Sequence, residues 1–380
     1  MKLFFCKILI IIVFLSATLQ SCSEKSKGEG DERVVGLWKL VERVESVSDR
    51  DEDLENEEGV NRIVPFQNIQ GYEFFSDGSC ENKAGYFMED PTNTGNEVYL
   101  GTNTNYSVKN DTLRIFNLTT GLWDSYKLSR IEKDTLEFQY DDDVFERFAR
   151  VEKNIENQPT FDKIVLSTTA CHGTCPINDI IIGKDGLFLF NGTEYNTNNG
   201  LYKTELDTSY FNQIQRAFQI ANIDKMQEEY LPPVTDLQTI QILFLKEGKV
   251  YKNISDKGHS SPAEFQWAYK ALQLMQQQVM LNRYKPKNDF LKSETLTISK
   301  GKDRLYLNKA ETAYLKYLLA EAKELKIPFV KMYVFNVRAS SGQIITASSD
   351  GRYVTIGNKT YDIGYNFINT LRSRFVPKED

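Results

Sequence analysis

Residues 167–176, with the sequence STTACHGTCP, join two predicted strands and concentrate the local chemistry of the chain. The segments at 163–167 and 177–182 are short apolar runs rich in β-branched residues, as is typical of buried strands. The stretch contains Cys171 and Cys175, two of the five cysteines in the chain, and one of its two histidines. We therefore expect a loop between two strands, with its cysteines close together.

Three kinds of chemistry fit the cysteines of this loop. A disulfide is favoured, because Gly173 permits a tight path and closing so small a loop contributes about 2 kcal/mol in the chain-entropy estimate. A zinc site could use Cys171 and Cys175 with His172 and His259, although Cys171 and His172 are adjacent and so are awkward ligands for one ion. Thiol redox chemistry usually uses a Cys-x-x-Cys spacing at the start of a helix. We predict a disulfide, with no metal ion and no cofactor.

The amino terminus has the pattern of an exported protein. A short basic segment at 1–7 precedes an apolar run at 8–19, which is too short to span a bilayer comfortably. The run ends in Leu-Gln-Ser-Cys at 19–22, which resembles the lipobox of bacterial lipoproteins. The resemblance implies a signal peptide over residues 1–21, lipidation of Cys22 with palmitate or similar acyl chains, and a stable membrane anchor.

A polar tether is expected over residues 22–33, because this segment has no apolar side chain able to pack. It is similar to the charged tethers of lipoproteins exported to the cell surface in the Bacteroidetes. Ser23 stands where many lipoproteins of the inner membrane have aspartate, so the resemblance implies the outer membrane. Surface-exposed and periplasm-facing orientations both remain open.

Charge and cysteine usage limit the possible partners. The net charge is −7, and removing residues 1–21 takes away two lysines and no acidic residue, which leaves −9. A nucleic-acid partner is therefore not expected. The mature chain would keep Cys80, Cys171 and Cys175 in an oxidising compartment. We predict that Cys80 is a buried free thiol.

Residues 34–152 show short alternating runs separated by turn residues, the pattern of an antiparallel meander that closes into a barrel. The segment resembles the lipocalin-like domains of Bacteroidetes lipoproteins in its Gly-x-Trp at Gly36 and Trp38 and in an arginine of the last strand, Arg147. The resemblance implies that Trp38 closes one end of the barrel and that Arg147 stacks on it. Whether the barrel is hollow stays open.

Residues 158–284 follow a polar linker and predict an α+β domain that carries the Cys-x-x-x-Cys loop. Apolar residues at helical spacing predict helices from 208 to 222 and from about 262, the second with a capping box at Ser261 and Glu264. The segment resembles an uncharacterised family of bacterial domains with the motif Ala-Cys-x-Gly-Thr-Cys-Pro. The matching residues are Ala170, Cys171, Gly173, Thr174, Cys175, Pro176, Asp185, Gly186, Thr235 and Asp236.

Residues 288–377 predict a second α+β domain, a possible diverged repeat of the first. Its long helix is capped by Asn308 with Glu311 three residues later, and its apolar stripe continues to Leu325. The chain as a whole is predicted to be a multi-domain β and α+β protein. An N-terminal lipocalin-like antiparallel β-barrel is followed by two α+β units of strand-strand-helix-strand-strand-helix type.

These patterns favour a membrane-anchored envelope lipoprotein that acts as a binding or scaffolding module. The chain has neither a Gly-x-Ser-x-Gly motif nor a phosphate-binding glycine loop, so catalysis is not favoured, although an enzymatic role stays open. The alternative is a metal-dependent or thiol-redox protein centred on Cys171, Cys175 and His259. The sequence does not distinguish a protein, a glycan or a small apolar molecule as the ligand.

Overall fold

The computed structural model describes residues 30–45, 69–90, 97–140, 144–288, 294–338 and 342–378. The predicted signal peptide, Cys22 and most of the predicted tether lie outside the described residues. The chain forms two compact units: the first contains the barrel, and the second contains residues 152–380 with two short earlier segments. No helix in the described ranges has the length and hydropathy needed to cross a membrane.

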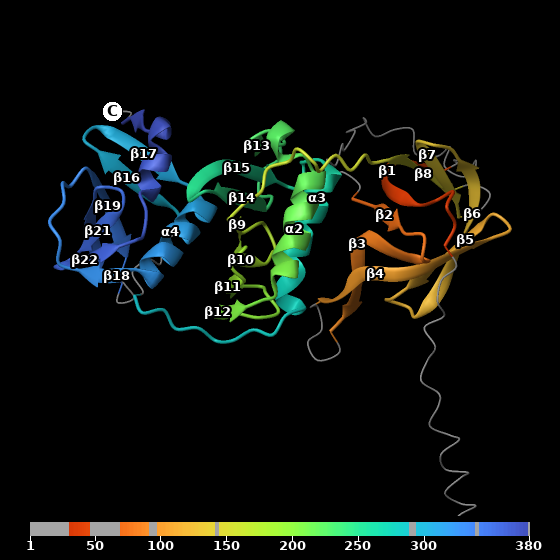
Figure 1. Ribbon diagram of the computed structural model, residues 1–380, viewed down its shortest axis with the longest axis horizontal. Helices are drawn as coiled ribbons and strands as arrows, with labels where there is room; N and C mark the ends of the chain where they lie inside the picture. The colour runs from red at the N-terminus through yellow and green to blue at the C-terminus, as the bar shows by residue number, and fades with distance from the viewer. Residues whose placement is uncertain are drawn as a thin grey trace, which may run out of the picture. The chain divides into compact units, whose positions relative to one another are not determined.

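Eight strands close the first unit into a barrel (Figure 1). The first strand pairs antiparallel with both the second and the last, which closes the sheet on itself. This closure confirms the predicted barrel. The strands are β1 (Gly36–Glu45), β2 (Gly71–Phe74), β3 (Ser79–Glu89), β4 (Glu97–Lys109), β5 (Thr112–Asn117), β6 (Leu122–Ile131), β7 (Thr135–Gln139) and β8 (Val144–Arg150).

Aromatic side chains fill the interior of the barrel. The ring centroids of Phe138 and Phe148 are 4.7 Å apart, and those of Phe74 and Tyr106 are 4.8 Å apart. Cys80 belongs to the same buried cluster and is a free thiol, as predicted. Side chains of this cluster therefore pack the interior of the barrel, which is common for barrels of eight strands.

An arginine does stack on Trp38, but it is Arg150 and not Arg147. The Cζ atom of Arg150 lies 4.1 Å from the ring centroid of the fully buried Trp38. Side chains alternate along β8, so Arg150 shares the inner face with Phe148, whereas Arg147 faces outward. There Arg147 donates from Nε to Glu137 at 2.8 Å. The assignment of Arg147 to the barrel end was wrong because the phase of the strand was misjudged.

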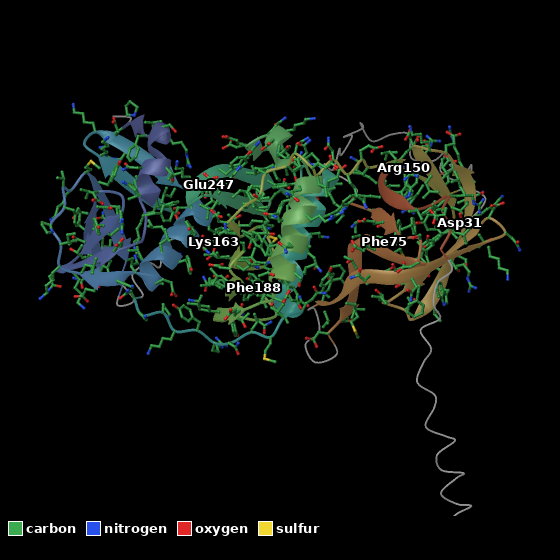
Figure 2. The ribbon with its side chains drawn as sticks, in the orientation of Figure 1. Asp31, Phe75, Arg150, Lys163, Phe188 and Glu247 are labelled. Atoms are coloured by element: carbon green, nitrogen blue, oxygen red, sulfur yellow. A yellow bond between two sulfur atoms is a disulfide. The ribbon has the colours of Figure 1, made fainter. Side chains whose placement is uncertain are left out.

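Gly36 lies at the start of β1 and has a φ of +143°. The carbonyl oxygen of the preceding Val35 accepts a hydrogen bond of 2.8 Å from Nη1 of Arg150. Figure 2 shows Arg150 among the side chains of the barrel. The Gly-x-Trp sequence thus begins the strand beside the arginine that covers the tryptophan.

The second unit begins with a seven-stranded sheet, which we call the middle sheet, in the order β12-β11-β10-β9-β14-β15-β13. Its neighbours are antiparallel, except that β13 runs parallel to β15. The strands are β9 (Lys163–Thr168), β10 (Ile177–Gly183), β11 (Leu187–Glu194), β12 (Gly200–Glu205), β13 (Glu229–Tyr230), β14 (Thr239–Lys246) and β15 (Lys249–Lys257).

Two helices, α2 (Thr208–Ile220) and α3 (Ala263–Leu274), cover one face of the middle sheet (Figure 1). Phe218 of α2 packs edge-on against Phe244 of the sheet, with ring centroids 5.0 Å apart, and it also contacts Phe265 of α3. Phe188, labelled in Figure 2, belongs to the same core. Short 3-10 helices follow the two helices at Ile223–Lys225 and Met275–Gln277.

The opposite face of the middle sheet packs against α4 (Lys309–Glu321). On its other side α4 contacts an eight-stranded C-terminal sheet, so the helix lies between two sheets (Figure 1). That position explains why apolar residues surround the helix instead of forming one stripe.

The C-terminal sheet has the order β18-β22-β21-β20-β19-β16-β17-β23. Its strands are β16 (Leu296–Lys300), β17 (Asp303–Leu307), β18 (Lys323–Leu325), β19 (Tyr333–Arg338), β20 (Ile344–Ser349), β21 (Tyr353–Ile356), β22 (Lys359–Asp362) and β23 (Val376–Pro377). The short helix α5 (Phe367–Thr370) and a 3-10 helix at Arg372–Arg374 precede the last strand.

Two helix ends differ from the sequence expectations. Pro262 is the N-cap of α3, and no side chain makes a capping hydrogen bond there. The hydroxyl of Ser261, which was expected to cap the helix, donates to Asp256. The predicted capping box at Ser261 is therefore wrong. The capping box at the start of α4 is present, but α4 ends at Glu321, and Lys323–Leu325 pairs with β22 as a strand.

The two sheets of the second unit share one spatial layout with the chain threaded in different orders. In the middle sheet the four-stranded meander β9–β12 comes first, and the hairpin β14–β15 lies beside β9. In the C-terminal sheet the hairpin β16–β17 comes first, and the meander β19–β22 places β19 beside β16. The predicted strand-strand-helix pattern thus misses two strands of each meander. The layouts are related by a circular permutation of the elements.

Candidate functional site

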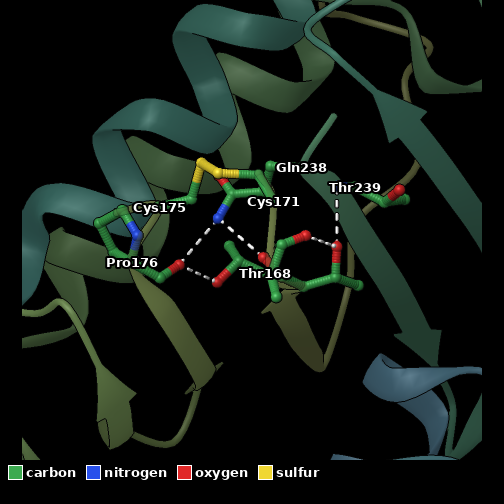
Figure 3. The surroundings of a disulfide bond; sticks show 8 residues. Thr168, Cys171, Cys175, Pro176, Gln238 and Thr239 are labelled. Atoms are coloured by element: carbon green, nitrogen blue, oxygen red, sulfur yellow. Dashed lines mark hydrogen bonds between the residues drawn. A yellow bond between two sulfur atoms is a disulfide. The ribbon is translucent and has the colours of Figure 1, made fainter. Parts of the chain in front are cut away.

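The cysteine loop connects β9 to β10, and the sulfur atoms of Cys171 and Cys175 are bonded to each other, consistent with the disulfide expectation. Hydrogen bonds hold the loop to the sheet (Figure 3). The amide of Gln238 donates to the carbonyl oxygens of Thr169 at 3.0 Å and Pro176 at 2.8 Å. The loop is therefore clamped at both of its ends by one side chain of the neighbouring segment.

The histidines of the metal alternative do not form a ligand cluster with these cysteines. His172 lies on the exposed loop, and Nδ1 of His259 bonds to the hydroxyl of Tyr269 at 2.7 Å. In the described part of the chain, no group of three or more His, Cys, Asp and Glu side chains is placed to hold a metal ion.

His259 belongs to a buried polar network around Asp256, which is fully buried. The Asp256 carboxylate accepts hydrogen bonds from the backbone N–H of Ser260 at 2.7 Å and from the hydroxyl of Tyr269 at 3.0 Å. The hydroxyl of Tyr269 thus lies within hydrogen-bond distance of both the Asp256 carboxylate and Nδ1 of His259. Burial lowers the pKa of His259, an effect that Asp256 opposes and Lys270 adds to. These hydrogen bonds hold the turn that precedes α3.

A row of polar side chains crosses the middle sheet on the face that α4 covers. Gln241 of β14, Ser167 of β9, Asp179 of β10 and Asn191 of β11 are cross-strand neighbours in register. Because side chains on paired strands at the same register share a face, these four form a continuous line, which we call the polar row.

The next line along the sheet is apolar. Val165, Ile181, Leu189 and Leu243 each lie two residues from a member of the polar row and so share its face. All four belong to the core that includes α4. The polar row thus marks the edge at which the packed interface between the middle sheet and α4 ends.

Asp179 is the charged member of the polar row and is 4 % exposed. Its Oδ1 accepts a hydrogen bond of 2.8 Å from the hydroxyl of Ser167, and its Oδ2 accepts one of 3.1 Å from Nδ2 of Asn191. Among the described residues, no basic side chain forms an ion pair with it. A carboxylate can accept about four hydrogen bonds, so Asp179 keeps unused acceptor capacity.

Lys309, the first residue of α4, brings a positive charge to the same place. The residue is 5 % exposed, and its Nζ donates to the carbonyl oxygen of Thr168 at 2.7 Å. Its backbone N–H donates to Oε1 of Gln241 in the polar row at 2.8 Å. Glu294 approaches the ammonium group to 3.6 Å from a position that is 59 % exposed.

A cleft of about 760 Å³ lies over Asp179 and Lys309. Strands β10–β12 form its floor, α4 forms one wall, and the segment at 284–288 forms another. The volume is in the range of small-molecule sites. Its lining combines apolar side chains with a few convergent polar groups, among them Asp179, Asn191, Asn199, Lys309 and Tyr317.

Sequence reasoning missed this site, although a signal was present. Each contributing strand is an apolar run with one or two polar residues in it or at its end, as in IVLS at 164–167, NDIII at 178–182, LFLFN at 187–191 and IQILF at 240–244. An isolated polar residue in a strand buried on both faces needs a partner. The alignment of four such residues depends on a register that one strand alone cannot give.

Comparison with known families gives one match. Residues 162–276 match a family described as Domain of unknown function (DUF6438), which covers a minority of the chain. The matched segment contains the cysteine loop and all four members of the polar row, but the wall formed by α4 lies outside it. No curated protein and no solved structure is significantly similar to the chain.

Proposed function

We propose that the protein is a membrane-anchored envelope lipoprotein whose second unit binds a small polar ligand in the cleft between the middle sheet and α4. The observation that carries the proposal is the pair of buried charges that line the cleft, Asp179 on its floor and Lys309 on its α4 wall, which bond to the protein through only part of their capacity. Burying charged groups costs free energy unless they are matched. A ligand that supplies the missing partners would offset that cost.

Filling the cleft tests the binding role. Ala320 lines the half-exposed wall on α4, so Ala320→Trp should fill the cleft with little effect on the core. We expect ligands found by a small-molecule screen on the full-length protein to lose affinity in this variant. Ala170→Trp, on the exposed cysteine loop, is the matched control. Loss of binding in Ala170→Trp alone would instead favour a site at Cys171 and Cys175.

The barrel in this proposal is a lipocalin-like scaffold. The Gly-x-Trp sequence at Gly36 and Trp38, together with an arginine stacked on the tryptophan, supports that likeness. Since aromatic rings fill the barrel interior, the proposed ligand site is in the second unit.

Anchorage rests on Cys22 and is tested separately. We expect Cys22→Ala to release the protein from the membrane fraction, because the acyl chains would be lost. Unchanged fractionation would contradict the lipoprotein assignment. Protease treatment of intact cells would then distinguish surface display at the outer membrane from a periplasm-facing orientation.

A further inference from the structure

The anionic end of the cleft is built to receive a cation. Asp179 is held by Ser167 and Asn191, both of which are themselves part of the polar row. The carboxylate therefore has a fixed orientation, keeps unused acceptor capacity and lines the cleft. A ligand ammonium group would supply charge-assisted hydrogen bonds, which are about twice as strong as neutral ones.

The cationic end of the cleft is built to receive an anion. An ammonium group has three donors, and Lys309 gives one of them to Thr168. Glu294 is the nearby carboxylate, but 3.6 Å exceeds a normal hydrogen bond, and the pair is exposed on the glutamate side. A ligand carboxylate can therefore displace Glu294 at small cost.

The two charged side chains form hydrogen bonds with consecutive residues of β9, Ser167 and Thr168. Asp179 bonds to the side chain of Ser167, and Lys309 bonds to the carbonyl oxygen of Thr168. The anchors are thus fixed by the backbone of β9. A ligand that meets both charges must carry its own positive and negative groups close together.

Beside the two charges, part of the cleft is suited to an apolar group, although Lys285 and Lys316 also line it. Ile181, Leu189 and Leu201 line the sheet side, and Leu319 lines the side of α4. An uncharged hydrocarbon chain leaving the charged end would lie along these side chains and be removed from water.

We propose that the cleft binds a zwitterionic, amino-acid-like ligand, with its ammonium group on Asp179, its carboxylate on Lys309 and an apolar side chain along Leu189 and Leu319. This inference rests on the proposed function, since it names the ligand class of the same site. A ligand of this class would give each of the two buried charges of the cleft a partner of opposite charge.

A series of matched probes tests the ligand class by titration calorimetry on the full-length protein. L-Leucine and L-phenylalanine carry both charges, N-acetyl-L-leucine lacks the ammonium group, and L-leucinamide lacks the carboxylate. We expect both single-charge analogues to bind at least about 10-fold more weakly than leucine, because each loses a charge-assisted hydrogen bond. Equal affinity of leucine and its N-acetyl form, or no binding of leucine and phenylalanine at millimolar concentration, overturns the inference.

Variants locate the two interactions. Asp179→Asn should weaken the binding of leucine and of leucinamide about 10-fold or more and should change the binding of N-acetyl-leucine little. Lys309→Met should weaken the binding of N-acetyl-leucine and should change that of leucinamide little. Asp185→Asn, in the β10–β11 turn and paired with Lys163, is the matched acidic control and should leave leucine binding unchanged. Circular dichroism and thermal melting confirm that each variant folds. Leucine binding that survives Asp179→Asn contradicts the assignment.

Failure of the ligand class and failure of the cleft are separable. If leucine does not bind, while another small molecule binds the wild type and not Ala320→Trp, the ligand class is wrong and the cleft remains a binding site. If every ligand of the wild type binds Ala320→Trp equally well, the cleft itself is not the site.

Discussion

The guanidinium group of Arg150 occupies the space that a side chain at Gly36 would need. A Cβ atom at Gly36 would lie 2.1 Å from Nη1 of Arg150, well inside van der Waals contact. Since Arg150 also covers Trp38, the end of the barrel is closed by three residues that constrain one another.

The first prediction follows from this contact. Gly36→Ala should destabilise the barrel by about 2 kcal/mol or more, because the new methyl group meets Arg150 and the φ of +143° is strained for alanine. Gly121→Ala is the control, since Gly121 also has a positive φ of +70° but no atom within 4 Å of its Cβ position. Urea denaturation measures both. Equal losses would mean that backbone strain alone acts.

The second prediction separates the two arginines of β8. Arg150→Met should lower the stability of the barrel by more than Arg147→Met, because Arg150 stacks on a buried ring whereas Arg147 makes partly exposed ion pairs. The expected difference is about 1 to 2 kcal/mol. Thermal melting followed by tryptophan fluorescence is the measurement. A larger loss for Arg147→Met would restore the original assignment.

The third prediction concerns the thiols of the chain from Ser23 onward. Only Cys80 should react with a thiol reagent, and only after denaturation, because burial raises the pKa of its thiol and excludes the reagent. Replacing Cys171 and Cys175 with serine should cost about 2 kcal/mol of stability by the loop-entropy estimate. Peptide mapping under non-reducing conditions checks the pairing. A label on Cys171 in the unreduced protein would contradict it.

The fourth prediction is a pH dependence. The folded pKa of His259 is lower than its ordinary value of 6.5, so below that pH the unfolded chain binds a proton that the folded chain resists. Stability should therefore fall as pH decreases through 6.5 towards the folded pKa. His259→Asn should reduce this slope, because it removes the titrating imidazole. Asparagine is chosen because it tolerates the φ of +55° at this position. Urea denaturation at a series of pH values decides, with His172→Asn as a surface control.

The fifth prediction is that the middle sheet needs its C-terminal cover. A chain of residues 152–287 should aggregate or form oligomers, because Val165, Ile181, Leu189 and Leu243 lose their contact with α4. Residues 152–380 should give a single soluble species in size-exclusion chromatography. A monomeric shorter chain would show that this apolar face tolerates water.

The barrel was predictable because its information is local. Alternation of apolar and polar residues with a turn every few positions requires no knowledge of distant partners, and each strand pairs with its neighbour in sequence. The error at Arg147 arose where two arginines lie three positions apart, so that only the phase set by the buried Phe148 decides which faces inward.

The cleft was not predictable for a different reason. β9 pairs with β14 across an intervening helix and about seventy residues, and α4 arrives from outside the matched family segment. Ser167 and Thr168 belong to the cysteine-loop stretch at 167–176, but their partners Asp179 and Lys309 are identified only by register and by packing. The disulfide, whose cysteines are four positions apart, required neither.

The permuted order of the two sheets has a consequence for synthesis on the ribosome. The middle sheet emerges with its meander before its hairpin, and both are complete before α4 leaves the exit tunnel. Its apolar second face must therefore wait for a helix translated later. The C-terminal sheet has the opposite schedule, since α4 emerges ahead of the β19–β22 meander that packs on it. One helix thus completes the core of the older sheet and is already present when the meander of the younger sheet is made, so the two halves share a core element that is translated between them.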